Sequence, residues 1–213
     1  MKSITSLRQF FLVVVTMMGM LILSTAQSQE GKTYIELNKT QPSETVGKVE
    51  VIEFFAYTCP HCKAMEPLIS DWSKTIPEDV ALMRVPVAFN ANLTDLQKLY
   101  FTLDNLERLD LHPKVFQALH NEGKSLYKAD EIIEWAEEQG LDRQVFSDIF
   151  NSFGIQSRVS RANELVKNYN IESTPSLAIG GKYVTSPGMT NSYEATITEA
   201  DKLIEKARER GQP

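Results

Sequence analysis

The sequence Glu53-Phe54-Phe55-Ala56-Tyr57-Thr58-Cys59-Pro60-His61-Cys62 lies where a predicted strand passes directly into a predicted helix. The strand, expected over 49–57, is nearly continuous in apolar and β-forming residues, as is typical of a strand buried on both faces. Beyond Cys62, apolar residues recur at helical spacing up to Ile76, and Pro67 is expected to kink this helix. A second apolar strand is predicted over 80–89. This order of strand, turn, helix and strand predicts the core of a βαβ unit.

The two cysteines of this turn are the only cysteines in the 213-residue chain. Cys59 is predicted at the helix N-terminus, where unpaired backbone N–H groups and the helix dipole favour a thiolate. Pro60 suits the first turn because the N–H that proline lacks would have no partner there. His61 can add a cation or a hydrogen-bond donor near the Cys59 sulfur, and Cys62 lies one turn further in. Since a stabilised thiolate makes the disulfide oxidising, these four residues predict a redox-active disulfide.

The sequence alone leaves three other interpretations of these residues open. The cysteines could be half of a zinc site, although the other two histidines, His112 and His120, fall in a helical region. They could form a purely structural disulfide, which would rarely be this short or lie at a strand–helix junction. His61 could be a solvated polar residue without influence on the thiol. Two cysteines do exclude a multi-disulfide scaffold and a four-cysteine zinc site.

The segment 92–169 differs in character and predicts helices alone. One amphipathic helix is expected from Leu96 to Leu106, and Asp130 and Asp142 are expected to be N-caps of shorter helices. About 75 residues of helix would then separate one pair of strands from the next.

The C-terminal part returns to strands and ends in a helix. Two short β runs at 173–179 and 182–185 are joined by Gly180-Gly181, which predicts a hairpin. A helix with one apolar face follows from Tyr193 and is expected to end at Gly211. A short strand is also predicted ahead of the βαβ unit, over 33–37.

Residues 1–28 have the pattern of a secretory signal peptide. Lys2 and Arg8 precede an apolar stretch of 14 residues, and small residues then offer cleavage after Ala26 or after Ser28. An uncleaved anchor is the alternative, but 14 helical residues span only about 21 Å. We therefore expect an exported, soluble protein. Its net charge of −6 and lack of basic runs argue against nucleic-acid binding.

The quoted segment resembles the active site of the DsbA family, periplasmic thiol:disulfide oxidoreductases of Gram-negative bacteria. The Cys-Pro-His-Cys tetrapeptide is specific among thioredoxin-like proteins, and the resemblance extends over nearly the whole chain after the leader. It implies an α/β thioredoxin-like fold with an inserted all-helical domain. The implied parts are a signal peptide at 1–28, a first thioredoxin-like part at 29–91, the helical insertion at 92–169 and a second thioredoxin-like part at 170–213.

The resemblance also implies roles for individual residues. Cys59 matches the attacking cysteine and Cys62 the buried one, and Pro175 matches a cis-proline that faces the disulfide. Thr174, just before this proline, is implied to pair with the substrate through its backbone. Thr58 and Thr174 both depart from the bulkier apolar residues of the best-known member, which bears on substrate preference.

Glu53 is a candidate supporting residue for two reasons. The resemblance matches it to a buried carboxylate beneath the active site, with Arg84 as its charge partner in place of a lysine. Independently, a carboxylate amid apolar strand residues is costly to bury unless it is paired or functional. We interpret Glu53 as a proton acceptor and donor for Cys62. The alternative is that it faces solvent on an edge strand.

The function expected from these features is donation of the Cys59–Cys62 disulfide to reduced, unfolded, newly exported proteins in the periplasm. A DsbB-type membrane quinone reductase would reoxidise the protein, which is expected to act as a monomer without a cofactor or metal. A reductase or isomerase of the same fold is the alternative within redox chemistry, although the chain offers no separate dimerisation domain for an isomerase. A peptide-binding holdase with vestigial cysteines is the alternative outside it.

Overall fold

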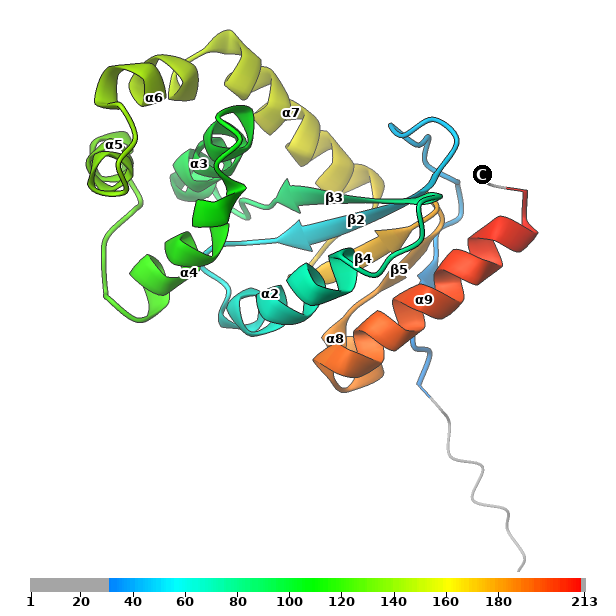
Figure 1. Ribbon diagram of the computed structural model, residues 1–213. Coiled ribbons are helices and arrows are strands. Elements are labelled where there is room, and N and C mark those ends of the chain that lie inside the picture. Colours follow the sequence, from blue (N-terminus) through cyan, green and yellow to red (C-terminus); the bar gives the residue numbers. More distant parts are fainter. Residues whose placement is uncertain (1–30, 212–213) are drawn as a thin grey trace, which may run out of the picture. The chain divides into compact units, whose positions relative to one another are not determined.

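The computed structural model describes residues 31–211, so the predicted signal peptide lies outside the described residues. Within 32–211 the chain forms one compact unit that combines a sheet with helices (Figure 1). The strands are β1 (Ile35–Glu36), β2 (Val49–Phe55), β3 (Val80–Pro86), β4 (Ser176–Ile179) and β5 (Tyr183–Thr185). The helices are α2 (Pro60–Ser73), α3 (Thr94–Asn105), α4 (His112–His120), α5 (Ala129–Glu138), α6 (Arg143–Phe150), α7 (Phe153–Asn168), α8 (Pro187–Thr190) and α9 (Tyr193–Glu209).

The five strands form one mixed sheet in the order β1-β5-β4-β2-β3. β2 is an inner strand: it runs parallel to β3, which places Glu53 opposite Arg84, and antiparallel to β4. β2, α2 and β3 form the predicted βαβ unit, because parallel neighbours need a crossover connection. β4 and β5 form the predicted hairpin, in which Gly180 and Gly181 adopt positive φ angles of 55° and 63°.

Each face of the sheet is covered by helices. On one face, Val49 and Val51 of β2 join a core with α2 and α9. On the other face, Ile52 and Phe54 join a core that continues into α3, α4, α5, α6 and α7. These five helices all fall between β3 and β4 in the chain, and they share that core with the sheet (Figure 1).

Several predicted boundaries need correction. The strand expected over 49–57 ends at Phe55, the strand expected over 80–89 ends at Pro86, and the strand expected over 33–37 is confined to Ile35–Glu36. Asp142 caps α6 as predicted by accepting from the Val145 N–H. Asp130 is not an N-cap, because α5 begins one residue before it and Lys128 precedes the helix.

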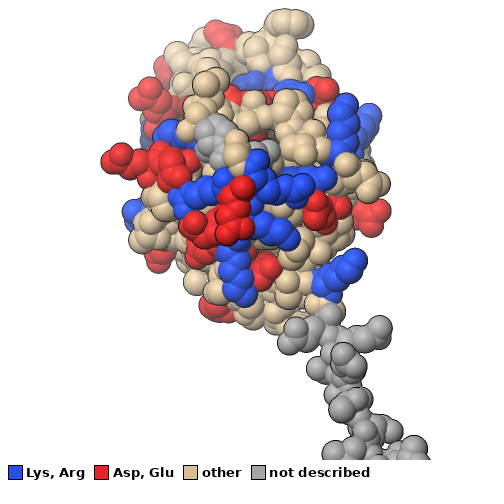
Figure 2. Space-filling model, turned by 90° about the vertical axis from the view of Figure 1, so that its right-hand side faces the viewer, with Lys and Arg blue, Asp and Glu red and all other residues tan. Residues whose placement is uncertain are grey.

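Acidic and basic side chains are intermingled on the face shown in Figure 2. Ion pairs such as Arg208–Asp79 and Arg210–Glu36 occur among the described residues. None of the helices within residues 31–211 is long and apolar enough to cross a membrane.

Candidate active site

Cys59 and Cys62 lie at the start of α2, directly after the central strand. Cys59 is the residue that precedes the helix, and Pro60 occupies the first helical position as predicted. The Cys59 side chain is partly exposed, whereas Cys62 is 1% exposed. Both thiols are free, so this is the dithiol form. The buried sulfur of Cys62 has a backbone partner, because the Ala56 N–H donates to Cys62 Sγ at 3.5 Å.

The environment of Cys59 favours its thiolate. A hydrogen bond from Cys62 is the largest cause that lowers the pKa of Cys59, from 9.0 to about 5. Backbone N–H groups of Cys62 and His61 at the helix N-terminus lower this pKa further, and burial opposes them. The pKa of Cys62 moves in the opposite direction, because burial raises it well above its ordinary value. Near neutral pH, the dithiol therefore carries its negative charge on Cys59.

This asymmetry predicts unequal reactivity of the two thiols. At pH 6 we expect iodoacetamide to label Cys59 at least about 100-fold faster than Cys62, because only Cys59 is accessible and ionised. Mass spectrometry of tryptic peptides, sampled over time, measures both rates. Carbamidomethylation of both cysteines at equal rates in the folded protein would contradict this assignment.

The loop before β4 brings Thr174 and Pro175 to the cysteines from a distant part of the chain. The Thr174–Pro175 peptide bond is cis, as the resemblance implies. When it is protonated, the Cys59 thiol donates a hydrogen bond to the Thr174 carbonyl, 3.2 Å from its Sγ. The backbone of Thr174 is therefore in contact with the partly exposed sulfur of Cys59.

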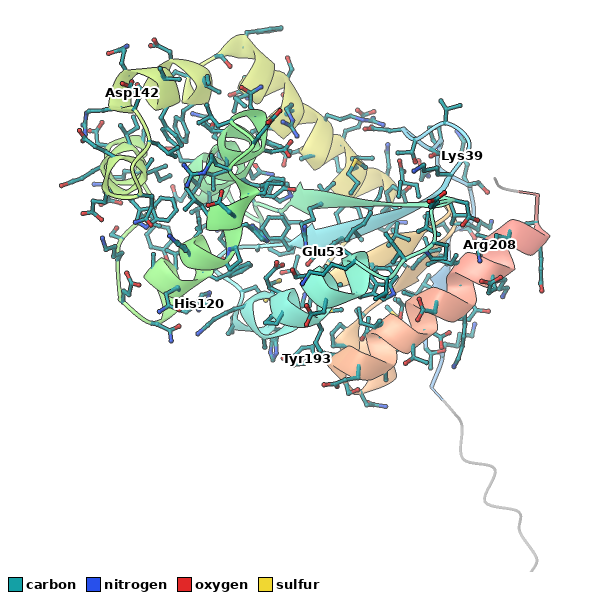
Figure 3. All side chains as sticks on the ribbon, in the orientation of Figure 1. Lys39, Glu53, His120, Asp142, Tyr193 and Arg208 are labelled. Atoms are coloured by element: carbon teal, nitrogen blue, oxygen red, sulfur yellow. The ribbon has the colours of Figure 1, made fainter. Side chains whose placement is uncertain are left out.

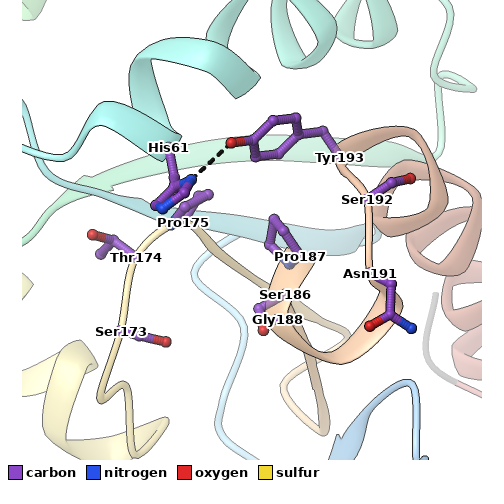
Figure 4. Close-up of a pocket in the computed structure, with 10 residues that line it drawn as sticks. All are labelled: His61, Ser173, Thr174, Pro175, Ser186, Pro187, Gly188, Asn191, Ser192 and Tyr193. Carbon is purple, nitrogen blue, oxygen red and sulfur yellow. Dashed lines mark hydrogen bonds between the residues drawn. The ribbon is translucent and has the colours of Figure 1, made fainter.

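A groove of about 560 Å³ lies beside this loop (Figure 4). Ten residues line it: His61, Ser173, Thr174, Pro175, Ser186, Pro187, Gly188, Asn191, Ser192 and Tyr193. His61 points into the groove, and its Nδ1 lies 2.8 Å from the hydroxyl of Tyr193, the first residue of α9. The imidazole is exposed, and it has a specific hydrogen-bond partner in Tyr193.

Glu53 is buried and paired, which rules out the edge-strand alternative. It is 1% exposed, on an inner strand, and Arg84 Nε donates to its Oε2 at 3.0 Å (Figure 3). Burial raises the pKa of Glu53 from 4.5 to about 7, and Arg84 limits the rise. Arg84 is also 3.5 Å from Glu66 of α2, so one guanidinium bridges two buried carboxylates. The hydrogen bonds of Glu53 run to Arg84, whereas Cys62 is served by the Ala56 amide.

Four functional candidates were not predicted from the sequence: Tyr57, Glu66, Tyr193 and, as part of this site, His112. His112 Nε2 lies 3.2 Å from Glu66 Oε2, and His112 Nδ1 lies 2.7 Å from the Tyr57 hydroxyl. Glu66 could have been noticed, because it is a carboxylate next to Met65 on the buried side of α2. No local signal connects Tyr193 with His61, since 132 residues separate them.

The zinc interpretation finds no support in the positions of the side chains. Among residues 31–211, no three or more His, Cys, Asp or Glu side chains are grouped so that they could hold a metal ion. His112 and His120 are each occupied by hydrogen bonds of their own.

Comparison with known proteins places these features in a family. Residues 44–199 match the family model described as Thioredoxin. The chain is 50% identical over 183 residues to the thiol:disulfide interchange protein DsbA of Bordetella parapertussis, covering 85% of this chain and 88% of that protein. It is 34% identical over 206 residues to DsbA of Pseudomonas aeruginosa, covering 95% and 98%.

Solved structures agree with the sequence matches. The crystal structure of Pseudomonas aeruginosa DsbA superimposes with a TM-score of 0.82 at 35% identity, over 85% of this chain and 95% of that one. The oxidoreductase NmDsbA1 from Neisseria meningitidis gives a TM-score of 0.77 at 29% identity, over 86% and 95%. Together with the mixed sheet and its helices, these matches confirm the predicted α/β thioredoxin-like fold with a helical insertion.

Proposed function

The chain belongs to the DsbA family of thiol:disulfide interchange proteins and is a protein thiol:disulfide oxidoreductase, and we propose that it works as an oxidase. In this role it transfers the Cys59–Cys62 disulfide to reduced, newly exported proteins. The observation that supports this direction is the opposite change in the two thiol pKa values, because a stabilised Cys59 thiolate stabilises the reduced enzyme relative to the disulfide.

The exchange proceeds in two displacements. A substrate thiolate attacks Cys59 Sγ, forming a mixed disulfide and releasing Cys62 Sγ with the electron pair of the broken bond. A second thiolate of the substrate then attacks the substrate sulfur of the mixed disulfide, and Cys59 leaves as a thiolate. Two electrons pass from the substrate to the enzyme, which ends as the dithiol. The low pKa of Cys59 makes it a good leaving group in the second step.

Other residues of the site support these displacements. Thr174 and Pro175 border the groove, and we assign the Thr174 backbone to hold the substrate peptide beside Cys59. We assign His61 to stabilise the Cys59 thiolate. Glu53, with a pKa of about 7, can accept and return a proton near neutral pH as Cys62 changes state, and Arg84 holds it in place.

The proposed setting is the periplasm, since the sequence begins with a signal-like segment and its relatives are DsbA proteins. A DsbB-type quinone-linked membrane protein would remove the two electrons and restore the disulfide. We propose that the enzyme acts as a monomer on substrates that are still unfolded. These assignments rest on family membership together with the chemistry of Cys59 and Cys62.

Equilibration with glutathione distinguishes an oxidase from a reductase. We expect the Cys59–Cys62 disulfide to be reduced by millimolar glutathione at pH 7, because the dithiol is favoured by its stable thiolate. The measurement is the dithiol fraction at graded ratios of reduced to oxidised glutathione, after acid quenching and alkylation. A disulfide that stays intact under a large excess of reduced glutathione would instead assign the protein to the reductases.

A further inference from the structure

Helix α4 begins and ends with a histidine, and both histidines contact Tyr57. Nδ1 of His112, at the first position, is 2.7 Å from the Tyr57 hydroxyl. His120, at the last position, donates its Nε2–H to the Tyr57 backbone carbonyl at 2.8 Å. His120 is labelled on α4 in Figure 3. Tyr57, two residues before Cys59, is thus held through both its side chain and its backbone.

The hydrogen bonds of His112 determine which atom donates in its contact with the Tyr57 hydroxyl. Burial lowers the pKa of His112, so the ring is neutral near pH 7 and has one donor and one acceptor nitrogen. As a carboxylate beside Arg84, Glu66 only accepts, so His112 Nε2 donates to it at 3.2 Å. His112 Nδ1 therefore accepts from the Tyr57 hydroxyl. The contact is directional and links the active-site loop, α4 and α2.

The loop that Tyr57 anchors provides backbone groups to both cysteines. The Ala56 N–H donates to Cys62 Sγ at 3.5 Å, and the Ala56 carbonyl accepts from the Cys59 N–H at 3.0 Å. The Ala56 amide also lowers the pKa of Cys62, opposing the effect of burial. Since Tyr57 directly follows Ala56, the two histidines restrain the residue next to the group that faces the buried sulfur.

We propose that His112 and His120 are positioning residues that, through Tyr57, aim the Ala56 amide at the Cys62 thiolate formed when the disulfide opens. In that step, the attacking thiolate bonds to Cys59 Sγ, the S–S bond breaks, and its electron pair moves to Cys62 Sγ. A fixed N–H donor at this buried sulfur stabilises the developing negative charge without reorganisation. The helical insertion thereby contributes to the rate of exchange as well as to the shape of the protein.

This inference rests on the proposed role of Cys62 as the leaving group, which the labelling of the two thiols and the formation of adducts by a Cys62→Ala variant test separately. It does not depend on whether the enzyme oxidises or reduces its substrates, because the same disulfide opens in either case.

The test removes each contact with little change in packing. Tyr57→Phe deletes the hydroxyl but keeps the ring, which packs against Phe55 and Phe116. His120→Leu removes the donor to the backbone, and His120→Gln restores an N–H of similar reach. Ile132→Val is the matched control: Ile132 is fully buried in α5, a neighbour of α3 and α6, and its loss of one methylene perturbs the helices without touching Tyr57.

The readout is the rate at which dithiothreitol opens the Cys59–Cys62 disulfide at pH 7, from quenched-flow alkylation. We expect Tyr57→Phe and His120→Leu each to slow this step about threefold, and the double variant to slow it by about tenfold or more. His120→Gln is expected to stay within about twofold of the parent, as is Ile132→Val. Urea denaturation of each oxidised variant shows that the variant is folded under the conditions in which its opening rate is measured.

Two outcomes would overturn the proposal. One is a double variant that is folded and opens at the parent rate, because the Ala56 amide would then need no support from α4. The other is an equal loss of rate in Ile132→Val, which would trace the effect to general loosening of the helices.

Discussion

A Cys62→Ala variant is expected to accumulate mixed disulfides on Cys59, whereas a Cys59→Ser variant is expected to form none and to have no oxidase activity. Without Cys62 the adduct cannot collapse back to the intramolecular disulfide, so it persists unless the substrate itself resolves it. Without Cys59 the exposed nucleophile is absent, and Cys62, at 1% exposure, cannot replace it. Activity of Cys59→Ser should fall by at least about 10³-fold.

The Cys62→Ala variant is first converted with glutathione disulfide to the mixed disulfide between Cys59 and glutathione, and a reduced, unfolded protein is then added. A substrate thiolate displaces glutathione as a thiolate, and non-reducing gels and mass spectrometry measure the resulting adduct. The oxidase assay follows the appearance of native disulfides in the same substrate. The assigned roles would be wrong if a Cys59→Ala variant formed mixed disulfides on Cys62 at the level that the Cys62→Ala variant forms them on Cys59. The holdase alternative predicts a different pair of results. The parent would have no oxidase activity, and the Cys59→Ser variant would suppress aggregation as well as the parent does.

Much of the site could be predicted because its information is local. The spacing of Cys59, Pro60, His61 and Cys62 at a strand–helix junction fixes which thiol is exposed and which is buried, since helix geometry alone places them. Residue patterns also predict the βαβ unit and the glycine hairpin, because β-branched runs and turn residues act over a few positions.

The limits of the predicted strands had a physical reason. Ala56 and Tyr57 have β-forming or apolar neighbours, and residues 87–89 continue an apolar run. After Phe55 the chain leaves the sheet because the backbone of Ala56 turns to other partners: its N–H donates to Cys62, and its carbonyl accepts from Cys59. After Pro86 the Val87 N–H still donates to the Phe55 carbonyl at 2.7 Å, so only the residues beyond Val87 depart from β2. The period of apolar residues does not report such contacts. Asp130 was misplaced for a similar reason, since several polar residues compete to start α5.

Long-range polar pairs were the part of the site least accessible to sequence. Pairing of Glu53 with Arg84 needed the parallel register of β2 and β3, and here the family resemblance provided it. The contact of His61 with Tyr193 joins α2 to α9 across 132 residues of sequence, and no pattern within either helix predicts it. The link from His112 to Tyr57 is similar, because a buried histidine in an apolar helix face has the same pattern as a core residue.

Reduced protein is expected to become more stable relative to oxidised protein as the pH rises from about 5 to about 8.5. In this range folded Cys59, with a pKa of about 5, is a thiolate, whereas an unfolded cysteine with its pKa of 9.0 keeps its proton. The unfolded state then binds more protons, so the free energy of unfolding of the dithiol rises with pH. The contribution of Cys59 to the stability of the dithiol is complete above pH 9.0, the pKa of the unfolded cysteine, and is lost as the pH falls through about 5, the pKa of the folded one.

Comparison of the two redox forms isolates Cys59 from other groups. The disulfide form has no thiol to ionise, whereas Glu53 is buried in β2 whichever redox form is present. Because burial raises its pKa to about 7, Glu53 makes the dithiol less stable as the pH rises from 4.5 to 7, so the slope of the difference above about pH 7.5 isolates Cys59. Cys62 opposes Cys59 only above about pH 9, where an unfolded thiol ionises and the buried one does not.

The gap between the two forms should therefore widen by about 2–3 kcal/mol over this range, a figure that allows for solvent screening at the half-exposed Cys59. Urea unfolding of both forms at pH 5.5, 6.5, 7.5 and 8.5 gives the gap directly. His61→Ser is the informative variant: if His61 stabilises the thiolate, the gap shrinks at every pH above 6. A gap that is flat with pH in the parent would contradict the low pKa of Cys59. A normal slope with no change in His61→Ser would leave the helix N-terminus and Cys62 as the sources of the thiolate's stability, and His61 would then serve only to line the groove with Tyr193.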